Sequence, residues 1–330
     1  MKPGHLMAAE IAQAPGVFAA VLVQNQNNIV NMLSLRSKNA FYTIARGSSD
    51  AAANILSYEF MRELRLPMTS LPPSIFSVGA GVAMHNAAAL VISQSGASDD
   101  LVRTARGIRD SGGTVLAITN MPGSAVEQAA HATLAIDAGP ELAVPATKSV
   151  VGSIAAGMAL LAALKPTYDA AGACAEFQDI PVHPQTMALT KALIKADNIY
   201  VIGRDTGYGA AHEVALKLKE CCALHAEAYS SSEVLHGPLQ LVTKPLLIVI
   251  LDTGQPDIQD SLNIAETRFR AAGGTVFRLK PSDIGIDRML PAAAAALLLC
   301  MVYPVILATA LALGHDPDAP ATLSKVTKTT

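Results

Sequence analysis

One short stretch of the chain combines residue types that can bind an anion. Ser93, Ser95 and Ser98 surround Gly96 in the run Ser-Gln-Ser-Gly-Ala-Ser. An apolar run typical of a buried strand ends just before it, and Asp99 opens a run typical of a helix. A strand-to-helix turn offers free backbone N–H groups and the positive end of a helix dipole. One helix cap at Ser98 would not explain three serines, so we predict a phosphate-type site.

A second group of residues could move protons. Glu213, Lys217 and Glu220 are spaced i, i+4 and i+7, which places them on one face of a helix predicted over residues 206–224. Two interpretations fit this spacing: a solvated stripe of ordinary helix ion pairs, or a lysine that holds a carboxylate at a proton-transfer position. Val214, Leu218 and Cys221 form another face, which we expect to pack inward.

A histidine provides a further acid–base candidate. His236 stands directly before Gly-Pro, and proline interrupts a helix, so we expect the histidine on a loop. Histidine can act as an acid or a base near neutral pH, although many loop histidines are ordinary surface residues.

Strands alternate with helices along the chain. The predicted strands of the first half are residues 41–45, 87–92, 114–118 and 132–136. The helices predicted there are residues 51–64, 99–109 and 147–164. This alternation predicts an α/β protein with a parallel sheet flanked by helices in three layers.

The second half repeats the first. The echoing pairs are 41–46 with 199–204, 90–96 with 246–254, and 111–115 with 272–276. The prolines of residues 166–184 predict a linker between the two copies. In the second copy the turn reads Asp252-Thr253-Gly254, and an aspartate repels phosphate. We therefore expect only the first copy to bind the anion.

Composition excludes several classes of function. Lys plus Arg total 24 against 27 Asp plus Glu, a net charge of −3, and no basic run predicts nucleic-acid binding. We predict no cofactor and no metal, because neither a dinucleotide fingerprint nor zinc-type spacing is present. The four cysteines are expected to be reduced core thiols of a cytoplasmic protein: Cys174, Cys221, Cys222 and Cys300.

One segment is long enough to cross a membrane. Residues 289–314 carry no charge, but Pro291 and Pro304 and many weakly apolar alanines favour a buried helix over a membrane span. The chain opens without a secretory signal, and we expect no membrane partner.

The motifs together resemble the tandem sugar-isomerase (SIS) domains that form the isomerase half of glucosamine-6-phosphate synthases. The motifs that carry the resemblance are Arg46–Ser49, Ser93–Ser98, Gly139–Lys148, Ala215–Glu220, His225–Tyr229, His236–Pro238, Asp318–Pro320 and Leu323–Lys325. Together with the order of the predicted elements, it divides the chain into a helical lead-in over 1–37, a phosphate-binding SIS domain over 38–165, a linker over 166–184, a second SIS domain over 185–315, and a tail over 316–330 that closes the active site.

The resemblance also implies roles for particular residues. It assigns phosphate binding to Ser49, Ser93, Gln94, Ser95 and Ser98, and sugar contacts to Gly47, Ser48, Val144, Ala146 and Ser324. Glu220 would be the base that moves a proton between C1 and C2, with Lys217 beside it. His236 would open the ring, reaching across the interface of a homodimer, and Lys325 would meet the carbonyl end of the open-chain sugar.

The sequence departs from the synthases at informative positions. Ala146 replaces a serine that touches the sugar, Leu235 a lysine, and Ala321 an arginine. The glutaminase domain and its cysteine nucleophile have no counterpart in this sequence, so we expect the reaction to run as a deamination. The sequence thus resembles stand-alone isomerase-type glucosamine-6-phosphate deaminases, which release fructose 6-phosphate and ammonia.

Three alternatives stay open at this stage. Ala146 and Leu235 leave room for a galactosamine-6-phosphate deaminase or for a deglycase of sugar-phosphate adducts with amino acids. A sensor that binds a sugar phosphate without turnover is the alternative of another class.

Overall fold

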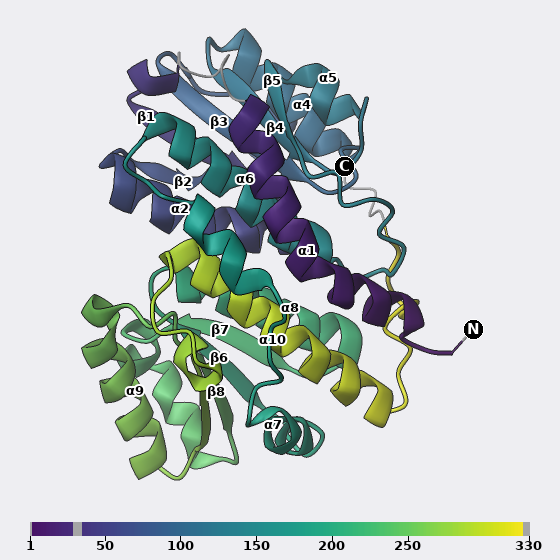
Figure 1. The fold of residues 1–330 in the computed structure, drawn as a ribbon, viewed down its shortest axis with the longest axis vertical. Coiled ribbons are helices and arrows are strands. Elements are labelled where there is room, and N and C mark those ends of the chain that lie inside the picture. The colour runs from purple at the N-terminus through teal and green to yellow at the C-terminus, as the bar shows by residue number, and fades with distance from the viewer. Residues whose placement is uncertain (1, 29–34, 326–330) are drawn as a thin grey trace. The chain divides into compact units, whose positions relative to one another are not determined.

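The chain forms two parallel sheets, each flanked by helices (Figure 1). The structure is a computed structural model that describes residues 2–28 and 35–325. Its residues fall into two compact units. The first-sheet unit contains residues 16–28, 35–141, 148–175 and 324–325, and the second-sheet unit contains 2–15, 142–147 and 176–323. The predicted α/β fold, with two parallel sheets that are each flanked by helices, is confirmed.

The first sheet has the strand order β2-β1-β3-β4-β5. Its strands are β1 (Ala40–Ile44), β2 (Met68–Ser70), β3 (Ala87–Ser93), β4 (Thr114–Thr119) and β5 (Ala132–Ala135). Every residue of β3 is buried, which explains why its sequence is continuously apolar up to Ser93. The strands β1 and β3 are neighbours, and the helices that follow them pack on opposite faces of the sheet. The topological switch point, where the strand order reverses, therefore lies between β1 and β3.

Helices cover both faces of the first sheet. Alternate residues of β3 pack with α4 (Asp99–Asp110) and α5 (Ala125–Ala129) in one apolar cluster. On the other face lie α2 (Ser48–Leu64) and α6 (Lys148–Leu164), which contact each other and the strands. The short helix α3 (Ser74–Ser77) packs on α4.

The second sheet has the order β7-β6-β8-β9 and repeats this plan with one strand fewer. Its strands are β6 (Ile199–Gly203), β7 (Ala226–Ser230), β8 (Leu247–Leu251) and β9 (Thr275–Leu279). One face packs on α9 (Gln259–Ala271) through Leu262 and Phe269. The other face is covered by α8 (Thr206–Cys222), which packs on α10 (Pro291–Ala312) (Figure 1). The helix α7 (Thr186–Leu193) also contacts α10.

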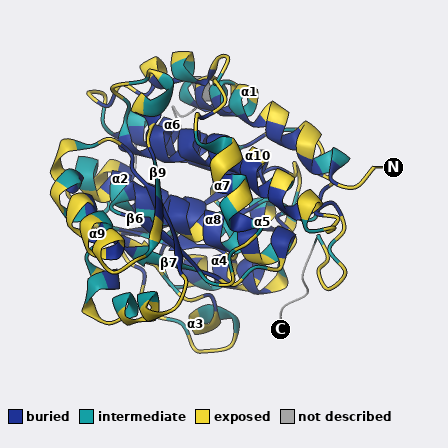
Figure 2. Ribbon diagram, turned by 90° about the horizontal axis from the view of Figure 1, so that it is seen from below, coloured by how far each residue is buried: buried dark blue, intermediate teal, exposed yellow. Residues whose placement is uncertain are grey.

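The uncharged segment near the C-terminus is a core helix of the second-sheet unit. Most residues of α10 are buried, and Figure 2 shows α8 and α10 largely in the colour of buried residues. Two helices in the described part of the chain are long and apolar enough to span a bilayer by length and composition, His5–Gln26 and Pro291–Ala312, with 39% and 78% of their most apolar windows buried. A buried core helix passes the same test, so length and composition alone do not indicate a span.

The first helix joins the two units. Helix α1 (His5–Asn28) begins in the second-sheet unit and continues into the first-sheet unit, within the range predicted as a helical lead-in. Its start is capped by a residue far along the chain: the backbone N–H groups of Leu6 and Met7 donate to the Asp318 carboxylate at 2.9 and 2.8 Å. Residues 29–34 of the lead-in and 326–330 of the tail lie outside the described residues. The predicted domain boundaries stay predictions.

Three details differ from the sequence-based expectations. The strands β2 and β7 were not predicted, and the predicted linker contains the 3₁₀ helix η2 (Ala171–Phe177). All four cysteines are free thiols, but Cys174 is partly exposed and not a core residue. It lies in η2, which packs less deeply than the helices that carry the other three.

Candidate active site

The serine turn joins the central strand of the first sheet to a helix. After β3 ends at Ser93, the backbone N–H of Gly96 donates to Ser93 Oγ at 3.1 Å, and that of Ala97 approaches Ser95 Oγ at 3.4 Å. Gly96 has φ +58°, and a Cβ there would overlap the Ser124 side chain, so the turn requires glycine. Ser98 stands at the N-cap of α4, yet its side chain makes no cap hydrogen bond. The capping interpretation of Ser98 is therefore wrong, and its hydroxyl remains available to a ligand.

A second turn rich in small polar residues lies at the same edge of the first sheet. Gly47 follows β1, and its φ of 56° and ψ of −131° are favourable for glycine. Ser48 and Ser49 then open α2. Because Ile44 pairs with Val91 in parallel register, the carboxyl ends of β1 and β3 lie side by side. Two helix N-termini thus begin at the switch point, where open parallel sheets bind their ligands.

A charged pair connects the two turns. Arg46 donates from Nε and Nη2 to Oδ2 of Asp100 at 3.1 and 3.0 Å. Asp100 is buried in the first turn of α4, while the Arg46 side chain is half-exposed. The guanidinium offsets a carboxylate that would otherwise oppose anion binding at this helix N-terminus.

The tail lysine is held at the first-sheet unit by a buried carboxylate. Lys325 Nζ lies 3.3 Å from Oε2 of Glu141, whose side chain is fully buried. The same oxygen accepts a 2.6 Å hydrogen bond from the Ser149 hydroxyl, and Oε1 accepts from the Ser149 N–H at 3.1 Å. Asn120, just beyond β4, holds the loop before Glu141 by bonds to Ala138 and Gly139. Sequence reasoning missed Glu141, although it lies within the Gly139–Lys148 motif.

The predicted sugar-contacting loop is anchored from two sides within the second-sheet unit. The N–H of Val144 donates to the Asp318 carbonyl at 3.1 Å, and that of Ala143 donates to Glu10 Oε1 at 3.2 Å. Val144 and Ala146 are both half-buried. Their side chains stay accessible while the backbone of the loop is fixed.

The acid–base candidates form a buried network on α8. Lys217 is fully buried, and its Nζ lies 2.6 Å from Oε2 of Glu220 and 3.4 Å from Oε1 of Glu213. Burial alone would lower the pKa of Lys217, but the two carboxylates outweigh it and raise that pKa above its ordinary value. Lys217 is therefore an ammonium ion at neutral pH. The solvated-stripe interpretation is wrong, because α10 covers this face of α8.

The two carboxylate oxygens of Glu220 have different surroundings. Lys217 binds only its Oε2, and Oε1 has no hydrogen-bond partner among the described residues. The side chain of Glu220 is 26% exposed, whereas Glu213 is fully buried. One carboxylate oxygen is thus fixed and the other is open to a ligand.

His236 lies in the same unit, apart from this network. It is the last residue of the 3₁₀ helix η3 (Glu233–His236), followed by Gly237 and the 3₁₀ helix η4 (Pro238–Thr243). The expectation of a loop was wrong in this detail: proline excludes an α-helix but is accepted at the start of a new 3₁₀ turn. The His236 side chain is exposed.

The predicted residues therefore fall into two groups, one in each unit. The first-sheet unit holds both serine-containing turns and the Lys325–Glu141 pair, and the second-sheet unit holds Val144, Ala146, His236 and the network on α8. Asp252, which was expected to repel phosphate, is buried and paired with Arg278 at 2.8 Å. Among the described residues, no group of three His, Cys, Asp or Glu side chains could hold a metal ion.

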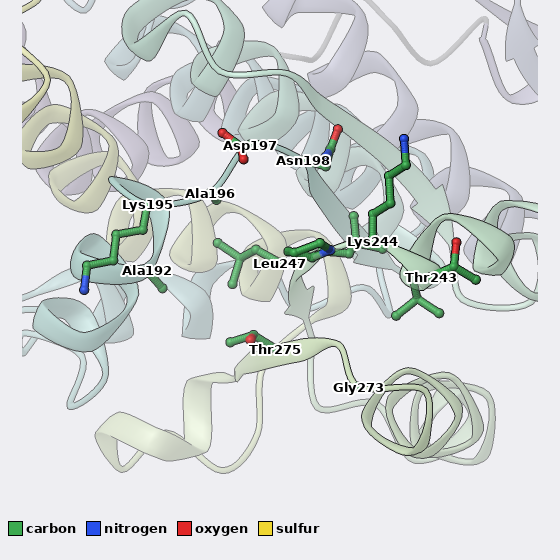
Figure 3. A pocket seen from close by; sticks show the side chains of 13 residues that line it. Ala192, Lys195, Ala196, Asp197, Asn198, Thr243, Lys244, Leu247, Gly273 and Thr275 are labelled. Carbon is green, nitrogen blue, oxygen red and sulfur yellow. The ribbon is translucent and has the colours of Figure 1, made fainter.

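A pocket at the opposite edge of the second sheet is separate from these residues. It lies where β8 and β9 begin, beside Leu247 and Thr275 (Figure 3). Lys195 and Lys244 flank it, but their side chains point in different directions. Parallel sheets bind ligands at their carboxyl edge, so this pocket is not part of the candidate site.

The chain is similar in sequence and fold to known proteins. The SIS domain model matches residues 34–163 and 192–280. A glutamine–fructose-6-phosphate aminotransferase of Pyrobaculum aerophilum is 31% identical over 97% of this chain and 57% of its own length. The chain spans about half the length of the curated relatives it matches.

Two solved structures share the fold over nearly the whole chain. A proposed phosphosugar isomerase from Silicibacter pomeroyi DSS-3 has a TM-score of 0.85 and 32% identity, covering 95% of this chain and 99% of that one. A glucosamine-6-phosphate deaminase from Thermotoga maritima has a TM-score of 0.72 and 19% identity, covering 96% of this chain and all of the other. The chain described here belongs to the SIS-domain family.

Proposed function

We propose that this chain is a sugar-phosphate enzyme that deaminates glucosamine 6-phosphate to fructose 6-phosphate and ammonia. The observation that carries the proposal is Glu220, a carboxylate with one oxygen fixed by a buried ammonium and the other free. Such an oxygen is suited to taking a proton from carbon and returning it one atom away. The serine turn supplies the anchor for the phosphate at the far end of the sugar.

The reaction follows from these groups in three steps. His236 moves the proton between the ring oxygen and O1, which opens the ring and exposes the C1 aldehyde. Glu220 then removes the proton from C2 and delivers it to C1, while the C2 amine releases one proton and O1 takes up one from the solvent. The C1 carbonyl thus becomes an alcohol and the amine at C2 becomes an imine. Water adds to this imine, and ammonia leaves as the C2 ketone of fructose 6-phosphate forms.

Two cations have supporting roles in this scheme. Lys217 holds Glu220 in place, and Lys325 faces the carbonyl end of the open-chain sugar. Glu141 binds the Lys325 ammonium at 3.3 Å, which favours electrostatic stabilisation of the developing charge at O1. The exposed position of His236 is compatible with action in the active site of a second subunit, and we propose a homodimer.

The test is turnover of purified protein on a panel of sugar phosphates. With glucosamine 6-phosphate, we expect ammonia and fructose 6-phosphate in equal amounts. Glu220→Gln should lower kcat by about 10²–10⁴-fold, the usual size of a general-base contribution. Glu233→Gln is the matched control, since Glu233 is an exposed glutamate outside the network, and it should leave kcat unchanged.

Other results would contradict the proposal in distinguishable ways. Faster turnover of galactosamine 6-phosphate or of a fructose 6-phosphate–amino acid adduct would redefine the substrate around Ala146 and Leu235. Interconversion of aldose and ketose phosphates without ammonia would indicate an isomerase. Glutamine-dependent formation of glucosamine 6-phosphate would indicate a synthase, and binding without any turnover would indicate a sensor.

A further inference from the structure

The apolar helix α10 carries a tyrosine that the scheme above does not use. Tyr303 is fully buried, and its hydroxyl donates to Oε1 of Glu213 on α8 at 3.1 Å. The other hydroxyl of this helix, on Thr309, bonds to the carbonyl of Val305 within α10 itself. Tyr303 thus directs a polar group from an otherwise apolar helix onto the network that holds Glu220.

Two donors approach the same carboxylate oxygen. Oε1 of Glu213 accepts from the Tyr303 hydroxyl and lies 3.4 Å from Lys217 Nζ. Lys217 is much closer to Glu220, at 2.6 Å. The single ammonium is therefore shared unequally between two carboxylates, in favour of the more exposed one.

Desolvation alone would favour the opposite distribution. A fully buried carboxylate needs a partner more than one that water reaches, so Glu213 should attract Lys217 more strongly than Glu220 does. The Tyr303 hydroxyl supplies Glu213 with a neutral donor and so reduces this pull. Cys221 lies on α8 with Lys217 and Glu213. It does not compete for Lys217 as a thiolate, because burial raises the pKa of Cys221 to about 12.

We propose that Tyr303 is a positioning residue, whose hydroxyl occupies Glu213 and thereby keeps Lys217 directed at Glu220. The proposal rests on the function proposed above for Glu220. Without the hydroxyl, Lys217 moves towards Glu213, and Glu220 loses the contact that orients its free oxygen towards the sugar. The effect belongs to the proton-transfer step and leaves the phosphate anchor in the other unit unchanged.

Tyr303→Phe tests the proposal because it removes one oxygen and keeps the ring that fills the core. We expect kcat to fall about tenfold with KM within twofold of the wild type, the pattern of a displaced catalytic group. Tyr168→Phe is the matched control: its hydroxyl also donates to a buried glutamate, Glu59 at 2.7 Å, in the first-sheet unit. This control should lose a similar amount of thermal stability and keep kcat.

A double-mutant cycle separates positioning from general structural damage. In Glu213→Gln the competing charge is gone, so Lys217 stays on Glu220 whether or not Tyr303 has its hydroxyl. The double variant should therefore match Glu213→Gln alone in kcat. Equal kcat for Tyr303→Phe and wild type, an equal loss in Tyr168→Phe, or additive losses in the cycle would overturn the proposal.

A crystal structure of Tyr303→Phe provides a readout that does not depend on the reaction. We expect Lys217 Nζ to be closer to Glu213 than to Glu220, and an unchanged ammonium position would refute the inference. Absence of turnover in the wild type would instead refute the proposed function, and the crystal structure would still decide the role of Tyr303.

Discussion

At the scale of one residue, Ser98 occupies a helix-capping position without making the capping hydrogen bond. It occupies the N-cap of α4, where serine usually bonds a backbone N–H of the first turn, but its hydroxyl makes no such bond. Asp99 and Asp100 already place negative charge at this helix end. The hydroxyl therefore contributes little to the stability of α4 in the absence of a ligand.

Ser98→Ala should therefore weaken substrate binding without weakening the fold. We expect KM for the sugar phosphate to rise about tenfold or more, as for the loss of a hydrogen bond to a charged group, while Tm changes little. Ser57→Ala is the control, because that buried hydroxyl bonds the Ala53 carbonyl within α2. It should leave KM unchanged. The phosphate role of Ser98 would be refuted by an unchanged KM together with a lowered Tm.

At the scale of elements, the start of α1 depends on a residue from the other end of the chain. The first N–H groups of a helix need acceptors, and the carbonyls of Lys2 and Gly4 accept from the N–H groups of His5 and Ala8. Asp318 supplies both of its oxygens, to Leu6 and Met7, and is itself buried. Its backbone carbonyl also fixes the Val144 loop. One residue thus links the first helix, the Val144 loop and the tail.

Removal of the Asp318 carboxylate should destabilise this arrangement. We expect Asp318→Ala to lower the free energy of unfolding by about 1–2 kcal/mol, the usual value of a helix cap with a favourable dipole interaction. Asp318→Asn keeps an acceptor oxygen and should lose about half as much. Thermal melts followed by circular dichroism measure both, with exposed Asp287→Ala as the control. Equal melting of Asp318→Ala and the control would contradict the capping role.

The elements also show what could be predicted from the sequence and why the rest could not. β3 and β8 were predictable because strands buried on both faces are continuously apolar. β7 was missed because Ala-Glu-Ala-Tyr-Ser is only partly buried at the edge of its sheet. The spacing of Glu213, Lys217 and Glu220 correctly predicted that they share one face of α8. The burial of that face depends on α10, about 80 residues further along, which periodicity within α8 cannot indicate.

At the scale of the whole molecule, the three buried thiols all lie in one unit. Cys221, Cys222 and Cys300 are all buried in the second-sheet unit, and burial raises the pKa of each thiol. For Cys221 and Cys300 the pKa rises from 9.0 to about 12. Lys217, in the same unit, also has a raised pKa. Each of these raised pKa values lowers the stability of the folded state at high pH.

The protein should therefore lose stability as pH rises from about 9 towards 12. Below pH 9 the thiols are protonated in both states, so their contribution is complete. Above it the unfolded chain releases protons that the folded chain retains, and each thiol lowers the free energy of unfolding by about 1.4 kcal/mol per pH unit. Tm should fall by several degrees between pH 8 and pH 10.

The variant Cys300→Ala tests the contribution of one buried thiol. Its free energy of unfolding should decrease between pH 8 and pH 10 by about 1.4 kcal/mol less than that of the wild type. This difference does not depend on the stability of the variant at pH 8. Burial also raises the pKa of the partly exposed Cys174 thiol, but less, so Cys174→Ala should keep more of the wild-type fall than Cys300→Ala does. An equal loss of unfolding free energy in Cys300→Ala and the wild type would show that the buried thiols do not cause the loss of stability at high pH. The same melts at pH 11 would then test Lys217, which titrates at higher pH.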